Sequence, residues 1–335
     1  MNISYNILWI DDSDDYVEST LELIQNTIRN NYMEPQIQNY SSYDEFKEKE
    51  LNNFDEQVFS CYDQILVDYA LSGSTGDEII KQIRTRNIFT DIVFYSSNYE
   101  SMIEEIKDKG QLDGVFFAKR ENLLSVINNV IKKNLKREFN IANIRGLIMD
   151  GTTEFDFICR TVSKILYNKL PEKKQVEIIE AAFSFMNKAS NNSKKNFKEL
   201  TDYKQKDHKK FFNKILDSVD YVMDNKDRYK LMTTIVKEFD FGKDFEESFA
   251  EQYSYDLIKP RNDLAHCKLY YGECKKKLHI AKEKGKYACN KECQNCRSKY
   301  DVAKCERIRS LLFEYYKILN KLDIETDNIN RSDTI

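Results

Sequence analysis

The sequence is poor in the two residues that most often form turns, with three prolines and nine glycines in 335 residues. Sheet proteins built from many hairpins need such residues at their turns, so this scarcity argues against a turn-rich all-β architecture. Apolar runs are short, and none approaches the ~18 residues that a membrane-spanning helix needs. We therefore expect no membrane partner and a helix-rich protein.

The N-terminus also lacks the features of a secretory signal, because residues 1–10 contain no basic segment and lead directly into Asp11 and Asp12. This pattern predicts a cytoplasmic protein. In that compartment the eight cysteines are expected to be free thiols or metal ligands rather than disulfides.

The net charge of −4 conceals an asymmetry between the two ends of the chain. Residues 1–120 carry 23 acidic and 10 basic side chains, which leaves 33 acidic and 42 basic side chains for the rest. The length itself predicts two domains. The basic part could meet an anionic polymer such as a nucleic acid, or it could be a solvated lysine-rich surface, and charge alone does not separate these interpretations.

Residues 1–138 alternate short apolar runs with amphipathic segments. Such alternation predicts an α/β doubly wound domain, in which helices cover both faces of a parallel sheet. The predicted strands are 5–10, 36–40, 64–67, 91–95 and 115–118.

Beyond residue 138 the apolar residues recur with helical spacing, which predicts an all-α domain over 139–325. A polar tail at 326–335 is expected to be disordered. The predicted helices are 154–170, 174–186, 211–223, 229–239, 245–258 and 302–322.

Acidic and polar side chains stand at the ends of the predicted strands, where doubly wound sheets bind their ligands. Asp11 and Asp12 follow the first strand, Asp68 ends the third, and Ser96 and Lys119 follow the last two. Carboxylates at this density suit Mg²⁺, and a carboxylate can attack phosphorus to form an acyl phosphate. A lysine and a serine beside it would neutralise and hydrogen-bond the transferred group.

These residues, with Gly76 eight positions after Asp68, resemble the receiver domain of two-component response regulators. The resemblance implies a flavodoxin-like fold, a Mg²⁺ site at Asp11, Asp12 and Asp68, and phosphorylation of Asp68 by a histidine kinase or a small phosphodonor. Arg120 and Ser72 stand where the family usually has proline. The alternative is a degenerate receiver that does not accept phosphate.

A polar segment in the helical region, KPRNDLAH, contains Arg261, Asn262 and His266. Pro260 suits the first turn of a helix, and residues four apart share a helix face. Arginine can hold a phosphodiester bidentately, and histidine can move a proton near neutral pH.

This segment resembles the RN-x-x-x-H motif of HEPN domains. The resemblance implies a HEPN-like bundle, a homodimer and metal-independent RNA cleavage, with Arg261 and His266 in cleavage and Asn262 in orientation. Two alternatives remain: a histidine that only packs or caps, and a HEPN fold that binds without catalysis.

A cysteine- and lysine-rich insertion is predicted at 267–305. Four thiolates on a short segment can close a tetrahedral Zn²⁺ site, and the alternative is a set of free or redox-active thiols. Its lysines and tyrosines would suit single-stranded nucleic acid or an ordinary solvated loop. The predicted zinc ligands are Cys289, Cys293, Cys296 and Cys305.

Together these patterns predict a response regulator, phosphorylated on Asp68, that controls a HEPN-like endoribonuclease acting on RNA. By analogy, such an effector would suit stress or phage defence. The alternative is a non-catalytic regulator whose helical domain binds RNA or a protein partner under receiver control.

Overall fold

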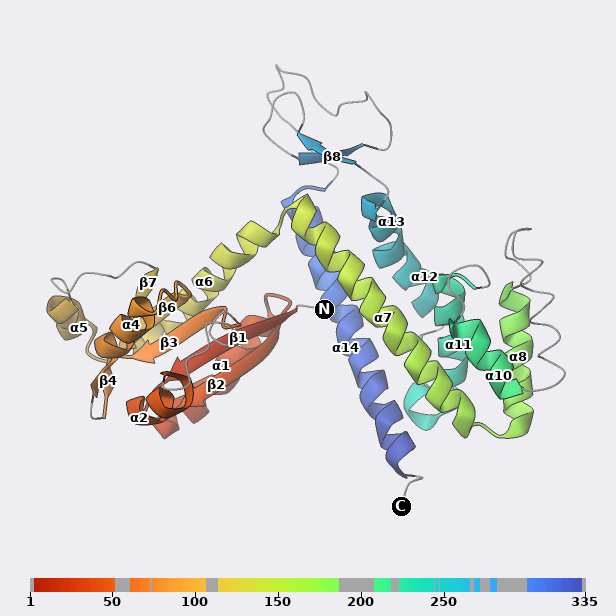
Figure 1. The fold of residues 1–335 in the computed structure, drawn as a ribbon, viewed down its shortest axis with the longest axis horizontal. Helices are drawn as coiled ribbons and strands as arrows, with labels where there is room; N and C mark the ends of the chain where they lie inside the picture. The colour runs from red at the N-terminus through yellow and green to blue at the C-terminus, as the bar shows by residue number, and fades with distance from the viewer. Residues whose placement is uncertain are drawn as a thin grey trace. The chain divides into compact units, whose positions relative to one another are not determined.

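The chain divides into two compact units, residues 2–138 and residues 139–335 (Figure 1). The computed structural model describes residues 3–51, 61–72, 74–106, 114–186, 208–217, 223–243, 245–246, 248–265, 268–271, 278–281 and 300–332. Within these ranges, none of the helices combines the length and the apolar character that crossing a membrane requires.

The N-terminal unit is built on a parallel sheet of five strands in the order β2-β1-β3-β6-β7. This is the 2-1-3-4-5 order of flavodoxin-like doubly wound folds, so the predicted fold class of this unit is confirmed. The strands are β1 (Ser4–Ile10), β2 (Glu34–Tyr40), β3 (Gln64–Asp68), β6 (Asp91–Ser96) and β7 (Val115–Lys119).

The central strands are hidden on both faces, which explains their unbroken apolar sequences. Ile65, Leu66 and Val67 of β3 are completely buried, as expected for a parallel strand covered by helices on both sides. A short antiparallel pair, β4 (Ala70–Leu71) and β5 (Ser74–Thr75), follows β3. The helices are α1 (Asp14–Arg29), α2 (Tyr43–Phe46) with the π-helical η1 (Lys47–Leu51), α4 (Gly76–Thr85), α5 (Tyr99–Ile106), the 3₁₀ turn η2 (Arg120–Asn122) and α6 (Leu123–Glu138).

Helix α4 starts in close contact with the end of β3, and a glycine makes this approach possible. A Cβ atom on Gly76 would lie 2.2 Å from the carbonyl oxygen of Asp68 and 2.6 Å from the ring of Phe94. The Gly76 backbone N–H donates to the Tyr69 carbonyl oxygen at 2.9 Å. The first turn of α4 is thereby held against the strand that carries Asp68.

The C-terminal unit is mainly helical. The two long helices α7 and α14 pack along each other, and α10, α11 and α13 also contact α7 (Figure 1). The core includes the fully buried Phe155, Cys159 and Leu312. The elements are α7 (Ile141–Lys169), α8 (Glu172–Met186), α10 (His208–Asp217), α11 (Asn225–Val236), the 3₁₀ turn η4 (Asp240–Gly242), α12 (Phe249–Tyr253), the π-helical η5 (Ser254–Ile258), α13 (Lys259–Ala265) and α14 (Val302–Ser332).

Two predictions for this unit are corrected. The prediction of an all-α domain missed an antiparallel hairpin formed by β8 (Lys268–Tyr271) and β9 (Leu278–Ala281), whose strands are too short to give a clear alternating pattern. The tail predicted to be disordered is largely helical, since α14 continues to Ser332. The continuation is stabilised by packing, because Thr326 is fully buried and Ile329 contacts the core.

Candidate metal centre

Three carboxylates meet at the carboxyl edge of the parallel sheet. Asp11 and Asp12 directly follow β1, and Asp68 is the last residue of the neighbouring strand β3. One carboxylate oxygen from each of the three lies within 4.8 Å of the others. The predicted convergence of these carboxylates is therefore confirmed, and it follows from the parallel pairing of the two strands.

Burial disfavours the ionised form of the carboxyl groups in this cluster. Asp11 and Asp68 are 0% and 2% exposed, and burial raises the pKa of both carboxyl groups above the ordinary aspartate value. The pKa of Asp68 reaches about 7, with Asp11 and Asp12 adding to the effect of burial and Arg120 opposing it. The cluster thus needs positive charge to remain ionised at neutral pH.

One oxygen of Asp68 has no partner among the described residues. Asp68 Oδ1 is buried and makes no hydrogen bond to any of the described residues. Unpaired carboxylate oxygens beside further carboxylates are the ligands that Mg²⁺ prefers. The donor set of Asp11, Asp12 and Asp68 therefore fits this ion.

Asp12 is oriented by Ser72, which follows the end of β3 by four residues. The backbone N–H and the hydroxyl of Ser72 both donate to Asp12 Oδ2, at 2.7 and 2.5 Å. Proline has neither donor. A serine at this position, where proline could not donate, therefore fixes one of the carboxylates in place.

A chain of buried aromatic side chains orients Asp11. Trp9 Nε1 donates to the hydroxyl of Tyr95 at 2.6 Å, and that hydroxyl donates to Asp11 Oδ2 at 2.5 Å. All three residues are completely buried. Sequence reasoning missed Tyr95, although a tyrosine within an otherwise apolar central strand is a signal, because a buried hydroxyl needs a partner.

The basic residue that ends β7 and the one directly after it make different contacts. Lys119 Nζ lies 2.6 Å from Oε1 of the exposed Glu100. Arg120 instead points into the acidic cluster, with Nη2 at 3.0 Å from Asp68 Oδ2 and 3.5 Å from Asp11 Oδ1. The sequence pattern predicts Lys119 as the cation beside Asp68. In the structure Arg120 makes that contact, whereas Lys119 pairs with Glu100.

Ser96 lies at the same edge of the sheet. It ends β6, it is paired in register with Lys119 of β7, and it is almost fully buried. Its hydroxyl oxygen accepts a hydrogen bond from the Asn98 backbone N–H at 3.1 Å. The carboxylates, the arginine and this hydroxyl thus come from the ends of neighbouring strands.

The polar motif of the helical unit is described in part. Arg261 and Asn262 lie on α13, and Arg261 Nη1 donates to Asn262 Oδ1 at 3.1 Å. His266 lies outside the described residues. The predicted helix start at Pro260 is only partly correct, because α13 directly follows the π-helical η5. Proline lacks the N–H of a regular helical bond, and a π-turn is one way for a helix to pass such a residue.

Of the four predicted zinc ligands, only Cys305 lies within the described residues. This cysteine lies on α14, is completely buried in the helical core, and has its thiol pKa raised to about 11 by burial. These surroundings favour the thiol, whereas zinc binds the thiolate. Cys289, Cys293 and Cys296 lie outside the described residues, and the zinc site stays a prediction.

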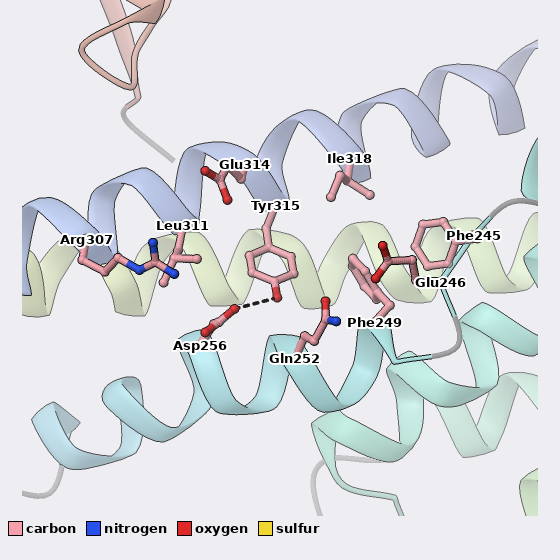
Figure 2. A pocket seen from close by; sticks show the side chains of 10 residues that line it. All are labelled: Phe245, Glu246, Phe249, Gln252, Asp256, Arg307, Leu311, Glu314, Tyr315 and Ile318. Atoms are coloured by element: carbon pink, nitrogen blue, oxygen red, sulfur yellow. Dashed lines mark hydrogen bonds between the residues drawn. The ribbon is translucent and has the colours of Figure 1, made fainter.

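The helical unit also has a groove of about 400 Å³ between α14 and the α12–η5 segment (Figure 2). Its walls combine aromatic and acidic side chains, and the Tyr315 hydroxyl donates to Asp256 Oδ2 at 3.2 Å. Neither Arg261 nor Asn262 lines it. Its lining includes Phe245, Phe249, Tyr315, Glu246, Asp256 and Glu314.

No protein-family model matches the chain, and no curated protein matches it in sequence. Among solved structures, it is similar to a receiver domain of a Francisella response regulator, with 20% identity over 39% of this chain and 99% of that one and a TM-score of 0.28. A CheY-like receiver domain protein from Methanospirillum hungatei matches with 15% identity over 40% of this chain and 98% of that one, with a TM-score of 0.29. A receiver domain protein from Clostridium thermocellum matches with 16% identity over 39% of this chain and 96% of that one, with a TM-score of 0.28.

Proposed function

We propose that the N-terminal unit is a phosphoryl-accepting receiver of the response-regulator type, with Asp68 as the acceptor. The observation that carries the proposal is the acidic cluster at the carboxyl edge of the 2-1-3-4-5 sheet, in which Asp68 keeps an oxygen without a hydrogen-bond partner among the described residues. The phosphoryl donor would be a histidine kinase or a small acyl phosphate.

The reaction is the transfer of a phosphoryl group from an oxygen or nitrogen atom of the donor to the carboxylate of Asp68. A carboxylate oxygen of Asp68 forms a bond to phosphorus while the bond from phosphorus to the donor breaks, and the donor keeps that electron pair. When Mg²⁺ is bound at Asp11, Asp12 and Asp68, it supplies charge neutralisation. The buried hydroxyl of Ser96 would donate to the new phosphoryl group and so couple the reaction to the segment after β6.

Asp68→Asn is expected to abolish phosphorylation of the protein. Purified full-length chain, incubated with Mg²⁺ and acetyl phosphate, should gain one phosphoryl group by intact-mass analysis. The side-chain amide that replaces the carboxylate is a poor nucleophile, so this variant should gain none. Asp15→Asn is the matched control, since Asp15 is an exposed carboxylate four residues from Asp11. An unmodified wild type, or equal modification of Asp68→Asn, would contradict the proposal.

For the C-terminal unit we propose metal-independent RNA cleavage that depends on Arg261 and His266, with Asn262 in an orienting role. Support comes from the contact between Arg261 and Asn262 on α13, from the position of His266 four residues further along the sequence, and from the basic composition of this half. In this proposal phosphorylation of Asp68 changes a homodimer of the helical unit and thereby controls cleavage.

Cleavage of a mixed-sequence RNA in EDTA is expected for the wild type and should fall at least about 100-fold in Arg261→Ala and in His266→Ala. Lys259→Ala is the matched control. Lys259 is also a basic residue of α13, and its ammonium contacts the ring of Tyr255. The assay is run with and without prior phosphorylation. No cleavage in either state would favour the second candidate, a non-catalytic regulator that binds RNA or a protein partner.

A further inference from the structure

The guanidinium of Arg120 lies between two carboxylates of the acidic cluster. Its Nη2 atom contacts both Asp68 and Asp11, at 3.0 and 3.5 Å. The Nε atom is buried and has no hydrogen-bond partner in the described part of the chain. A donor without a partner therefore sits on the same side chain that contacts the acceptor.

Arg120 is held in this position from both its side chain and its backbone. Its guanidinium lies 4.4 Å from the centre of the Tyr16 ring, and the Tyr16 hydroxyl donates to the Arg120 carbonyl oxygen at 3.1 Å. The Tyr16 ring in turn contacts the rings of Trp9 and Tyr95. Stacking on an aromatic face is a property of arginine that orients its planar donors.

Lys119 has a different set of contacts. Its ammonium pairs with Glu100 at 2.6 Å and lies 5.7 Å from the centre of the Tyr99 ring. The pair is largely exposed to solvent. The lysine is therefore engaged at the surface, while the arginine beside it is engaged with the buried acceptor.

This arrangement has two chemical consequences. Transfer of a phosphoryl group to Asp68 would move negative charge from the carboxylate to phosphoryl oxygens, and a guanidinium fork matches such oxygens with parallel N–H donors. Before transfer, the Arg120 guanidinium contacts Asp11 and Asp68, which a divalent cation would also need as ligands. It should therefore oppose binding of that cation.

We propose that Arg120, rather than Lys119, is the residue that contacts the phosphoryl group on Asp68, and that it also weakens binding of divalent cations to the acidic cluster. This inference rests on the proposed function of Asp68 as a phosphoryl acceptor. It assigns to one residue opposite effects on two measurable steps.

The first measurement is the rate of phosphorylation by acetyl phosphate at saturating Mg²⁺, on full-length protein. Arg120→Ala should slow the reaction at least about tenfold, because a donor to the developing charge is lost. Arg120→Lys keeps the charge without the planar fork and should fall between this variant and the wild type. Lys119→Ala is the matched control and should stay within about twofold of the wild type.

The second measurement is Mg²⁺ affinity without phosphodonor. Trp9 is the single tryptophan of the chain and is joined to Asp11 through Tyr95, so its fluorescence reports on the cluster. Arg120→Ala should bind Mg²⁺ at least about threefold more tightly than the wild type, because a competing charge is removed. An arginine with a purely structural role would weaken both metal binding and phosphorylation.

The outcomes separate this inference from the proposed function. A wild type that gains no phosphoryl group overturns the proposed function. An active wild type with an equally active Arg120→Ala, or with a larger loss in Lys119→Ala, overturns only the assignment of Arg120. Slower phosphorylation together with weaker Mg²⁺ binding in Arg120→Ala also overturns it, since that result indicates a structural role.

Discussion

Gly76→Ala is expected to destabilise the N-terminal unit by about 2–4 kcal/mol, because the added methyl group has no space. Its Cβ would lie 2.2 Å from the carbonyl oxygen of Asp68, and this neighbour is backbone of a buried strand rather than the end of a flexible side chain. Helix α4 would have to move away from β3. Urea unfolding followed by Trp9 fluorescence measures the effect in this unit, since Trp9 is the single tryptophan.

Gly146→Ala provides the matched control for this substitution. Gly146 lies within α7, and a Cβ atom built there meets nothing within 4 Å. Alanine should therefore stabilise the C-terminal unit by about 0.5–1 kcal/mol through its better helix propensity. If Gly76→Ala unfolded at the same urea concentration as the wild type, the close approach of α4 to β3 would be wrong.

Asp156→Ala is expected to destabilise the C-terminal unit by about 3–5 kcal/mol, because it removes a carboxylate from a buried arginine. Arg228 is completely buried, and its Nη1 atom lies 3.4 Å from Asp156 Oδ1 and 3.0 Å from Asn225 Oδ1. Arg160, one turn after Asp156, also contacts that carboxylate. Without Asp156, Arg228 and Arg160 would both lose the carboxylate that they contact at this point.

An exposed ion pair in the same unit provides the comparison. Lys164 Nζ lies 2.5 Å from Oδ1 of Asp217, whose side chain is 58% exposed. Asp217→Ala should cost less than about 1 kcal/mol, because solvent already screens this pair. Urea unfolding followed by far-UV circular dichroism compares the variants. The double substitution Asp156→Leu and Arg228→Met should recover much of the loss, and equal costs for Asp156→Ala and Asp217→Ala would contradict the argument.

The placement of the acidic cluster could be predicted because it depends on chain direction alone. Asp11 and Asp68 each come at the end of an unbroken apolar run, and adjacent parallel strands bring their carboxyl ends to one edge. Gly76 was part of the same pattern, although only the structure shows that its missing Cβ lets α4 approach β3. Helical periodicity likewise located the main helices of the C-terminal unit.

The two wrong expectations about α14, a disordered tail and a cysteine grouped with the insertion, have a common cause. The helix α14 extends to Ser332 because the C-terminal unit buries Thr326 and contacts Ile329. Those residues are polar or widely spaced in the sequence, so local composition suggested disorder. Cys305 was grouped with cysteines of the insertion by spacing, yet it belongs to the buried face of this helix.

The sequence by itself determined the alternation of strands and helices, and hence which carboxylates share an edge of the sheet. Only the tertiary structure decided which cation joins them. Lys119 and Arg120 are adjacent and chemically similar, and their directions depend on distant partners: Glu100 holds the lysine at the surface, whereas Tyr16 supports the arginine over Asp68. Such choices depend on contacts between residues far apart in the chain, which local patterns of charge and polarity do not encode.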